Sequence, residues 1–235
     1  MIELGGLRAI ATGDAAADLV AVVLHGRQMQ ASDLAPFAGA LLAPGAASGA
    51  SVTRGGAGYC VFPDAPLPAA PRGRTWWEVD SEARIRRLAA GPMELSAMDP
   101  GGRAEARAQL AGLLDALARP GRRIVLAGFS QGGMLAMDHV LHAPREARPA
   151  ALALVSSTRI AIADWTPRAT ALAGLPVLVA HGTRDDELAF RAGELLRDFA
   201  IAGGARVTWL AFDGGHDLPM VVWRGLRRFV RELSG

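Results

Sequence analysis

Lysine is absent from this chain of 235 residues, so the 25 basic side chains other than histidine are all arginines. A protein without lysine can form no Schiff base through a lysine amine, and it lacks the phosphate-gripping lysine of a P-loop. The formal net charge is only +2, and acidic residues lie near most of the arginines. No basic stripe therefore indicates a nucleic-acid partner.

Cysteine, signal-like segments and membrane-length apolar runs are equally scarce. Cys60 is the single cysteine, which excludes an internal disulfide, and its apolar neighbours predict a buried thiol. The first residues lack the basic segment and apolar block of a secretory signal, and no apolar run has the length of a membrane span. We therefore expect a cytoplasmic protein with no stable insertion into a membrane.

Short apolar runs alternate with longer helical patterns along most of the chain. This alternation predicts an α/β fold with a mostly parallel central sheet and helices on both faces. No internal repeat or linker divides the pattern, so we expect one domain over residues 1–235. The predicted strands are 19–26, 59–66, 122–130, 150–157, 175–182 and 206–212. The predicted helices are 31–43 (capped by Ser32 or Asp33), 99–121 (with Asp99 near its start), 131–143, 187–202 and 218–233. A loop is expected over 45–58 and an irregular segment over 64–98, with a helical piece near 85–88.

The stretch "AGFSQGG" places Ser130 where a predicted buried strand meets a predicted helix. Gly128-Phe129-Ser130-Gln131-Gly132 matches G-x-S-x-G, which in this context is the nucleophile elbow of α/β-hydrolases. The sharp turn strains the serine backbone and brings strand and helix close together, so the residues two before and two after the serine must be small. The helix start also favours developing negative charge. We predict that Ser130 is a nucleophile; a tight turn without chemistry is the alternative.

A serine hydroxyl needs a base that takes its proton. In this fold the triad follows the chain order serine, acid, histidine, so the base should lie in a loop after the last strand. His216 in "AFDGGHDLP" is placed in that way, and Gly214 and Gly215 leave its loop free to fold back over Ser130. The remaining histidines are interpreted as packing, helix-surface or loop-shaping residues: His25, His139, His142 and His181.

The acid should follow the preceding strand, in "HGTRDDEL". Asp185 lies nearer to the strand end and is the preferred candidate, because Asp186 is more naturally the N-terminal cap of the next helix. Asp164 is a weaker alternative. The carboxylate would hold the His216 ring in one tautomer and stabilise the imidazolium.

The oxyanion hole needs two backbone N–H groups. One comes from the residue after the nucleophile and the other from a loop after an early strand. Gln131 and Arg27 occupy these two positions. A plain tight turn is the alternative interpretation of His25-Gly26.

Several segments occur in the order seen in one known family: "LHGRQMQASDL", "PDAPLP" followed by "RTWWEVD", "GFSQGG", "HGTRDDEL" and "GGHDLP". Through them the chain resembles the phospholipase/carboxylesterase family of α/β-hydrolases, which includes acyl-protein thioesterases. The resemblance runs from about residue 19 to the C-terminal helix. It implies Ser130 as nucleophile, Asp185 as acid and His216 as base, with Arg27 and Gln131 at the oxyanion positions. The family often has a small or apolar residue at the position of Arg27 and a V-P pair after the acid, where this chain has "ELAF".

Residues 159–174, between two late strands, are too few for a large lid, so an open, shallow cleft is expected. Its walls are predicted from residues 27–30, which include Met29, and from residues 64–98. Trp76 or Trp77 would line the substrate pocket, unless both pack that segment onto the core.

Together these residues predict a serine hydrolase that cleaves carboxylic esters of short to medium acyl chain through an acyl-enzyme. An acyl-protein thioesterase or lysophospholipase uses the same cleavage step and stays open as an alternative; a non-catalytic binding protein of the same fold is less favoured. The expected partner is a small ester or thioester. A homodimer is compatible with the sequence, although no apolar stripe marks an interface. No metal or cofactor is expected, because the His and Cys residues lack ligand spacing.

Overall fold

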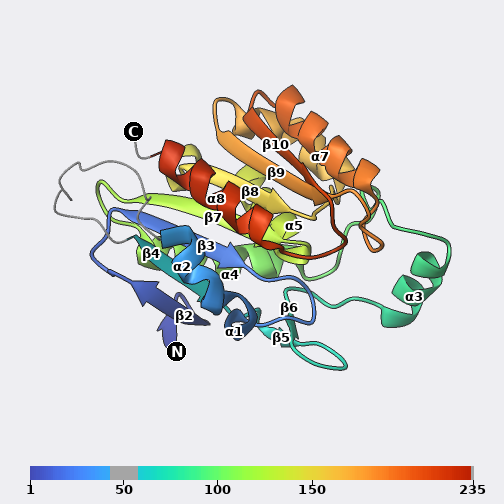
Figure 1. The fold of residues 1–235 in the computed structure, drawn as a ribbon, viewed down its shortest axis with the longest axis horizontal. Coiled ribbons are helices and arrows are strands. Elements are labelled where there is room, and N and C mark those ends of the chain that lie inside the picture. Colours follow the sequence, from blue (N-terminus) through green and yellow to red (C-terminus); the bar gives the residue numbers. More distant parts are fainter. Residues whose placement is uncertain (43–57, 234–235) are drawn as a thin grey trace.

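The structure is a computed structural model that describes residues 1–42 and 58–233. Its strands are β1 (Ile2–Leu4), β2 (Leu7–Gly13), β3 (Leu19–Leu24), β4 (Tyr59–Pro63), β5 (Leu67–Pro68), β6 (Arg74–Thr75), β7 (Arg123–Phe129), β8 (Ala151–Val155), β9 (Pro176–Gly182) and β10 (Arg206–Phe212). Eight of these described strands form one sheet in the order β1-β2-β4-β3-β7-β8-β9-β10 (Figure 1). The neighbours from β4 to β10 are parallel, and β1 and β2 extend the sheet as antiparallel strands.

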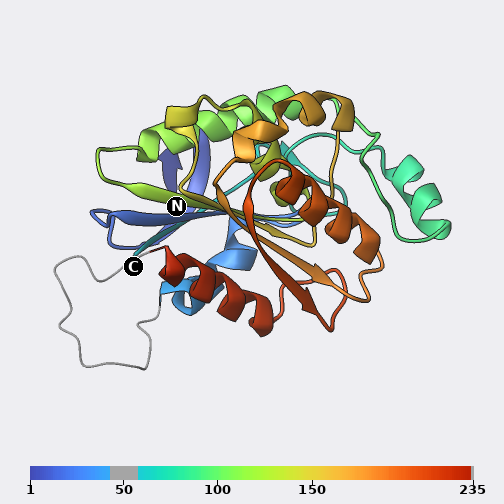
Figure 2. The ribbon, with the colours of Figure 1, turned by 90° about the horizontal axis from the view of Figure 1, so that it is seen from above.

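Helices cover both faces of this sheet (Figure 2). They are α1 (Ala31–Leu34), η1 (Ala35–Phe37), α2 (Ala38–Leu42), α3 (Ser81–Ala89), α4 (Arg103–Leu117), α5 (Gln131–His142), η2 (Arg145–Ala147), α6 (Ile162–Trp165), η3 (Thr166–Leu172), α7 (Phe190–Ala202) and α8 (Met220–Glu232). One core lies between the sheet and α4, α5 and α7, and a second lies between the sheet and α1, α2 and α8. Strand β3 serves both cores because alternate side chains point to opposite faces: Val20, Val22 and Leu24 enter the first, and Ala21 and Val23 the second.

The predicted architecture is confirmed by this mostly parallel sheet between two helical layers. Within the described residues, the link from β8 to β9 holds only α6 and η3, as expected for a chain without a large lid. Helix α3 has no buried residue and projects from the edge of the molecule at which the parallel strands end (Figure 1). No helix in the described ranges is both long and apolar enough to cross a membrane.

Strands β1 and β2 were not predicted. They form a hairpin through Gly5 and Gly6, which both have positive φ, and only Leu7 and Ala9 of β2 are fully buried. A strand with so few buried positions gives a weak period-2 signal, so its pairing with β4 decides the structure rather than its own pattern.

The prediction of one continuous helix over 31–43 was wrong in detail. The segment folds as α1, a 3₁₀ turn and α2, and the turn contains Pro36, whose ring disfavours a continuous α-helix. The predicted cap, Ser32 or Asp33, is also wrong: Gln30 precedes the helix, and its N–H donates to Asp33 Oδ2 at 2.9 Å.

Other boundaries moved inward from their predicted positions. Helix α4 starts at Arg103 after Gly102, whose left-handed backbone (φ 81°) precedes the first turn, and Asp99 pairs with the Arg103 side chain. Helix α7 starts at Phe190 after Ala189, so Asp186 is not its cap. The expected loop 45–58 lies outside the described residues except for residue 58, whereas 64–98 contains the short pair β5–β6 and α3.

Candidate active site

Ser130 stands between β7 and α5, in the tight turn that its sequence predicts. Its backbone has φ 51° and ψ −118°, a strained conformation for a residue with a side chain. The strain is sustained by hydrogen bonds on both sides: the Ser130 N–H donates to the carbonyl of Val155 at 2.9 Å, and its carbonyl accepts from Gly133 N–H at 2.9 Å. The turn therefore holds the hydroxyl at the carboxyl end of the sheet.

The glycines around Ser130 are required by close backbone contacts. A Cβ on Gly132 would lie 2.6 Å from the carbonyl oxygens of both Leu24 and His25, and one on Gly128 would overlap the carbonyl of Gly132. These contacts bring α5 against the ends of β3 and β7, and they explain the two small residues at fixed distance from the serine.

His216 joins Ser130 to Asp185. Its Nε2 lies 2.9 Å from Ser130 Oγ, and its Nδ1 lies 2.8 Å from Asp185 Oδ2. The loop after β10 that carries His216 packs against the loop after β9, where Gly182 leaves room for the carbonyls of Gly214 and Gly215. The structure thus brings together the three side chains singled out from the sequence.

Asp185 is buried, and both of its carboxylate oxygens have hydrogen-bond partners. Its Oδ1 accepts hydrogen bonds from the N–H groups of Glu187 at 3.0 Å and Leu188 at 2.8 Å. Burial opposes its ionisation, but the hydrogen bonds from His181, His216 and Leu188 outweigh burial and hold the pKa of Asp185 well below its ordinary value. The carboxylate therefore stays charged and can orient the His216 ring.

The remaining histidines have other partners. Buried His181 contacts Asp185 Oδ2, the same oxygen that His216 contacts, at 3.3 Å, a supporting contact that the sequence did not reveal. His25 is buried; its Nε2 accepts from the Ala65 N–H at 3.0 Å, and burial lowers its pKa. His139 is buried on α5, and His142 contacts the backbone carbonyl of Asp138 and the Asp164 side chain.

The two backbone N–H groups predicted for the oxyanion hole, those of Arg27 and Gln131, make no backbone hydrogen bond within the described residues. The chain before Arg27 runs close to the nucleophile, because a Cβ on Gly26 would lie 3.3 Å from the Cβ of Ser130. The following residues are fixed by backbone hydrogen bonds to Arg74.

The side chain of Gln131 has a structural task that the sequence reasoning missed. Its Oε1 accepts from the Trp76 N–H and from Thr75 Oγ1, both at 3.0 Å, and its Nε2 donates to the Trp77 carbonyl at 3.3 Å. The sequence does contain a signal for this role: Gln131 is a polar residue beside a predicted buried turn, and a buried polar side chain needs hydrogen-bond partners.

A cleft of about 580 Å³ opens over Ser130 and His216. Of the predicted substrate-binding residues, Met29 and Trp77 line it, whereas Trp76 does not. Trp76 is turned into the core, where its indole N–H donates to the carbonyl of His25 at 2.9 Å. Further apolar lining comes from α5, the segment after α3 and the loop before α7: Met134, Met93, Leu95, Met98 and Leu188.

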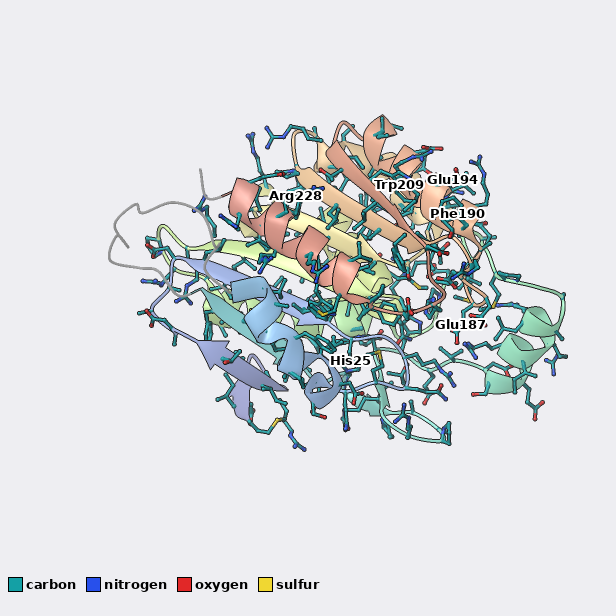
Figure 3. The ribbon with its side chains drawn as sticks, viewed as in Figure 1. His25, Glu187, Phe190, Glu194, Trp209 and Arg228 are labelled. Atoms are coloured by element: carbon teal, nitrogen blue, oxygen red, sulfur yellow. The ribbon has the colours of Figure 1, made fainter. Side chains whose placement is uncertain are left out.

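The segment after α3 is tied to the loop that carries the acid. Met93 pairs with Leu188 as in a parallel sheet. The Met93 N–H donates to the Glu187 carbonyl at 2.8 Å, and the Ala189 N–H donates to the Met93 carbonyl at 3.0 Å. Glu187 itself points to the side of the molecule from which α3 projects (Figure 3), with its Oε2 2.5 Å from Arg84 Nη2 and 3.8 Å from His216 Nε2.

One cluster within the described residues has the geometry of a metal site: Asp138, His142 and Asp164. Buried Asp138 already accepts from the guanidinium groups of Arg103 and Arg107, and Asp164 accepts from Arg103 at 3.0 Å. Arginines thus neutralise these carboxylates, and the cluster fits an ion-pair network better than a cation. Asp164, the weaker candidate for the acid, belongs to this network and not to the contacts of His216.

The chain matches one family model and is similar in fold to several solved structures. The family model described as Phospholipase/Carboxylesterase matches residues 104–234, a stretch that includes Ser130, Asp185 and His216 but not Arg27. No curated protein matches the chain. Among solved structures, esterase PE8 is similar with 22% identity and a TM-score of 0.74, over 97% of this chain and 99% of that one.

Two further solved structures show the same fold. Acyl-protein thioesterase 2 of Zea mays has 17% identity and a TM-score of 0.67, over 97% of this chain and 99% of that one. The carboxylesterase of Bacillus cereus has 18% identity and a TM-score of 0.64, over 97% of this chain and 94% of that one.

Proposed function

The chain belongs to the phospholipase/carboxylesterase family, and we propose that it is a serine esterase in which Ser130, His216 and Asp185 form the catalytic triad. The observation that carries this proposal is the pair of contacts made by one imidazole, 2.9 Å to Ser130 Oγ and 2.8 Å to Asp185 Oδ2. A serine hydroxyl is a weak nucleophile, and this arrangement supplies the adjacent base and the group that orients the base.

The proposed reaction uses these side chains in two half-reactions. Ser130 Oγ attacks the ester carbonyl while His216 Nε2 takes its proton, and the N–H groups of Arg27 and Gln131 stabilise the oxyanion. His216 then gives the proton to the leaving alcohol, which departs and leaves an acyl-serine. Water enters with His216 again as base and releases the carboxylic acid and the free hydroxyl.

Esters of short to medium acyl chain are the proposed substrates. The cleft of about 580 Å³ supports this choice because its apolar lining, which includes Met93, Met98 and Met134, can hold an acyl chain of limited length. A thioesterase or lysophospholipase activity would use the same serine and stays the second candidate, which the fold shared with the Zea mays thioesterase favours.

Labelling and kinetics test the proposal. A fluorophosphonate probe should label the wild-type protein and not Ser130→Ala, which separates an enzyme from a binding protein of the same fold. Hydrolysis of 4-nitrophenyl esters should peak between acetyl and octanoyl chains. A flat profile up to palmitoyl would contradict the chain-length proposal, and a higher kcat/KM on a palmitoyl thioester than on short oxygen esters would favour the thioesterase.

The organisation as one domain over residues 1–235, the cytoplasmic location and the homodimer stay predictions. Limited proteolysis, cell fractionation and sedimentation of the purified chain are their respective measurements.

A further inference from the structure

Within the described residues, most of the arginines that line the cleft form no ion pair with a carboxylate. Four arginines line the cleft: Arg27, Arg72, Arg84 and Arg87. The carboxylates in the same lining are Glu78, Asp80 and Glu187. Arg84 is paired with Glu187 at 2.5 Å, whereas in the described part of the chain no carboxylate forms an ion pair with Arg27, Arg72 or Arg87. Asp80 is engaged at the start of α3, where it accepts the Ala83 N–H at 2.9 Å.

Arg27 is the unpaired arginine whose backbone directly follows Gly26, the residue that lies against Ser130. It is half-buried, and its Nη2 donates to Ser81 Oγ at 3.0 Å. Burial lowers its pKa and the neighbouring guanidinium of Arg84 lowers it further, and together they outweigh the attraction of Glu187, which raises it. A half-buried cation beside another cation is stabilised when an anion binds between them.

The position of Arg27 relative to Ser130 sets the length of a ligand. The backbone at Gly26 abuts Ser130, which is consistent with the Arg27 N–H as a proposed oxyanion donor, while the Arg27 guanidinium reaches away to Ser81 at the start of α3. The positive group therefore lies one arginine side chain away from the scissile carbonyl. This spacing fits an anionic group separated from the ester by a short chain, not one on the atom next to the carbonyl.

We propose that Arg27, with Arg84 beside it, forms an anion-binding subsite in the active-site cleft, and that the preferred substrates are esters carrying a carboxylate or phosphate. A guanidinium is suited to this task because it presents paired N–H donors to planar or tetrahedral oxyanions. Glu187 forms its ion pair with Arg84 and attracts Arg27 only from a longer distance, so the guanidinium of Arg27 keeps its donors for the ligand. The exposed Arg72 and Arg87 add to the positive field at the cleft. This inference rests on the proposed esterase function.

Two pairs of matched esters test the subsite and tell the acyl side from the alcohol side. Mono-4-nitrophenyl adipate and 4-nitrophenyl hexanoate differ by a carboxylate at the end of the acyl chain. 4-(Hexanoyloxy)benzoate and its methyl ester differ by a carboxylate on the leaving group. The readout in each pair is the ratio of kcat/KM for the charged ester to kcat/KM for the neutral ester, because damage to the catalytic centre as a whole cancels in this ratio.

In one of the two pairs, the ratio should fall by about tenfold or more from wild type to Arg27→Met, as expected for loss of a charged hydrogen bond. Arg27→Lys should recover much of the ratio because it keeps the charge. Arg145→Met, which removes an exposed arginine on η2, is the matched control and should leave the ratio unchanged. An unchanged ratio in Arg27→Met for both ester pairs would overturn the proposal.

A measurement on the wild-type protein covers the case in which Arg27→Met does not fold. Adipate should inhibit hydrolysis of the neutral hexanoyl ester more strongly than hexanamide does, and added sodium chloride should weaken the difference because salt screens the charges. Equal inhibition by the two compounds at low salt would overturn the subsite. Turnover of the neutral ester and fluorophosphonate labelling report on the esterase function separately, so its failure is distinguishable from failure of the subsite.

Discussion

The side-chain oxygen of Gln131 accepts a hydrogen bond from the backbone N–H of Trp76 at 3.0 Å. The residue that follows the proposed nucleophile therefore also holds the segment that presents Trp77 to the cleft. One short motif thus supplies the proposed nucleophile, a proposed oxyanion donor and the anchor of a cleft wall.

Gln131→Met keeps the length of the side chain but removes its polar atoms. The buried N–H of Trp76 loses its acceptor, whereas the Thr75 hydroxyl keeps the Trp77 carbonyl at 2.6 Å. The free energy of unfolding should therefore fall by about 1–3 kcal/mol. The freed wall should also raise KM more than it lowers kcat. Urea denaturation and steady-state kinetics measure the two effects. Unchanged stability together with an unchanged KM would show that the anchor is dispensable.

Gly132→Ala should damage both folding and activity. The added Cβ would lie 2.6 Å from two backbone oxygens, and backbone cannot move aside as a flexible side chain can. We expect a loss of at least about 2 kcal/mol in unfolding free energy and a fall of about 100-fold in kcat/KM. The matched control is Gly39→Ala on α2, where a Cβ would meet no atom of the described residues within 4 Å. This control should be neutral or slightly stabilising, and equal damage in both variants would remove the steric explanation.

His139 should lower the free energy of unfolding in mild acid. Burial lowers its pKa from 6.5 to about 4, and its Nε2 has no hydrogen-bond partner in the described structure. The unfolded chain therefore binds more protons than the folded chain between these two values, so stability declines as pH falls through 6.5 and the loss is complete below pH 4. The full difference is about 3 kcal/mol.

His139→Leu should flatten the dependence of unfolding free energy on pH between 6.5 and 4. Some slope remains in the variant, because burial also lowers the pKa of His25. Asp185 acts in a lower window, since its depressed pKa contributes stability that is lost only as pH falls below the ordinary carboxyl range. Urea titrations at several pH values measure the slope, and equal slopes in wild type and variant would contradict the assignment.

Cys60 should be inert in the folded protein. Burial raises the pKa of its thiol to about 12, so almost no thiolate is present at neutral pH, and its side chain is inaccessible. A thiol reagent such as 5,5′-dithiobis(2-nitrobenzoate) should react with one thiol per chain in denaturant and with none in native buffer. Because the chain has a single cysteine, the signal needs no deconvolution. Rapid reaction in native buffer would show that β4 opens on the timescale of the assay.

The sequence predicts the central part of the fold because strands buried on both faces and their helices leave strong patterns. It also predicts that the side chains of Ser130, Asp185 and His216 lie together, because the order of elements brings the ends of β7, β9 and β10 to one edge of the sheet. The hydrophobic pattern of the sequence does not predict side-chain positions that depend on contacts between distant segments. Trp76 and Trp77 are neighbours in the chain, and only the path of the segment across Gln131 determines which of them lines the cleft.

The ion pair between Arg84 and Glu187 at the cleft is another contact that the sequence does not predict. Arg84 and Glu187 lie 103 positions apart, and nothing in either local sequence links them. Their pairing depends on how the segment after α3 returns to the loop after β9. Departures from a familiar motif, such as the arginine after His25-Gly26, therefore point to positions of interest without showing their partners.

The pairing of Met93 with Leu188 makes the far wall of the cleft and the acid-bearing loop one mechanical unit. The amide of Leu188 that borders Met93 also donates to the Asp185 carboxylate. We therefore expect a ligand that pushes Met93 outward to disturb the backbone that supports Asp185, the proposed acid. The acyl-chain length that the cleft tolerates and the alignment of the proposed triad should accordingly be coupled.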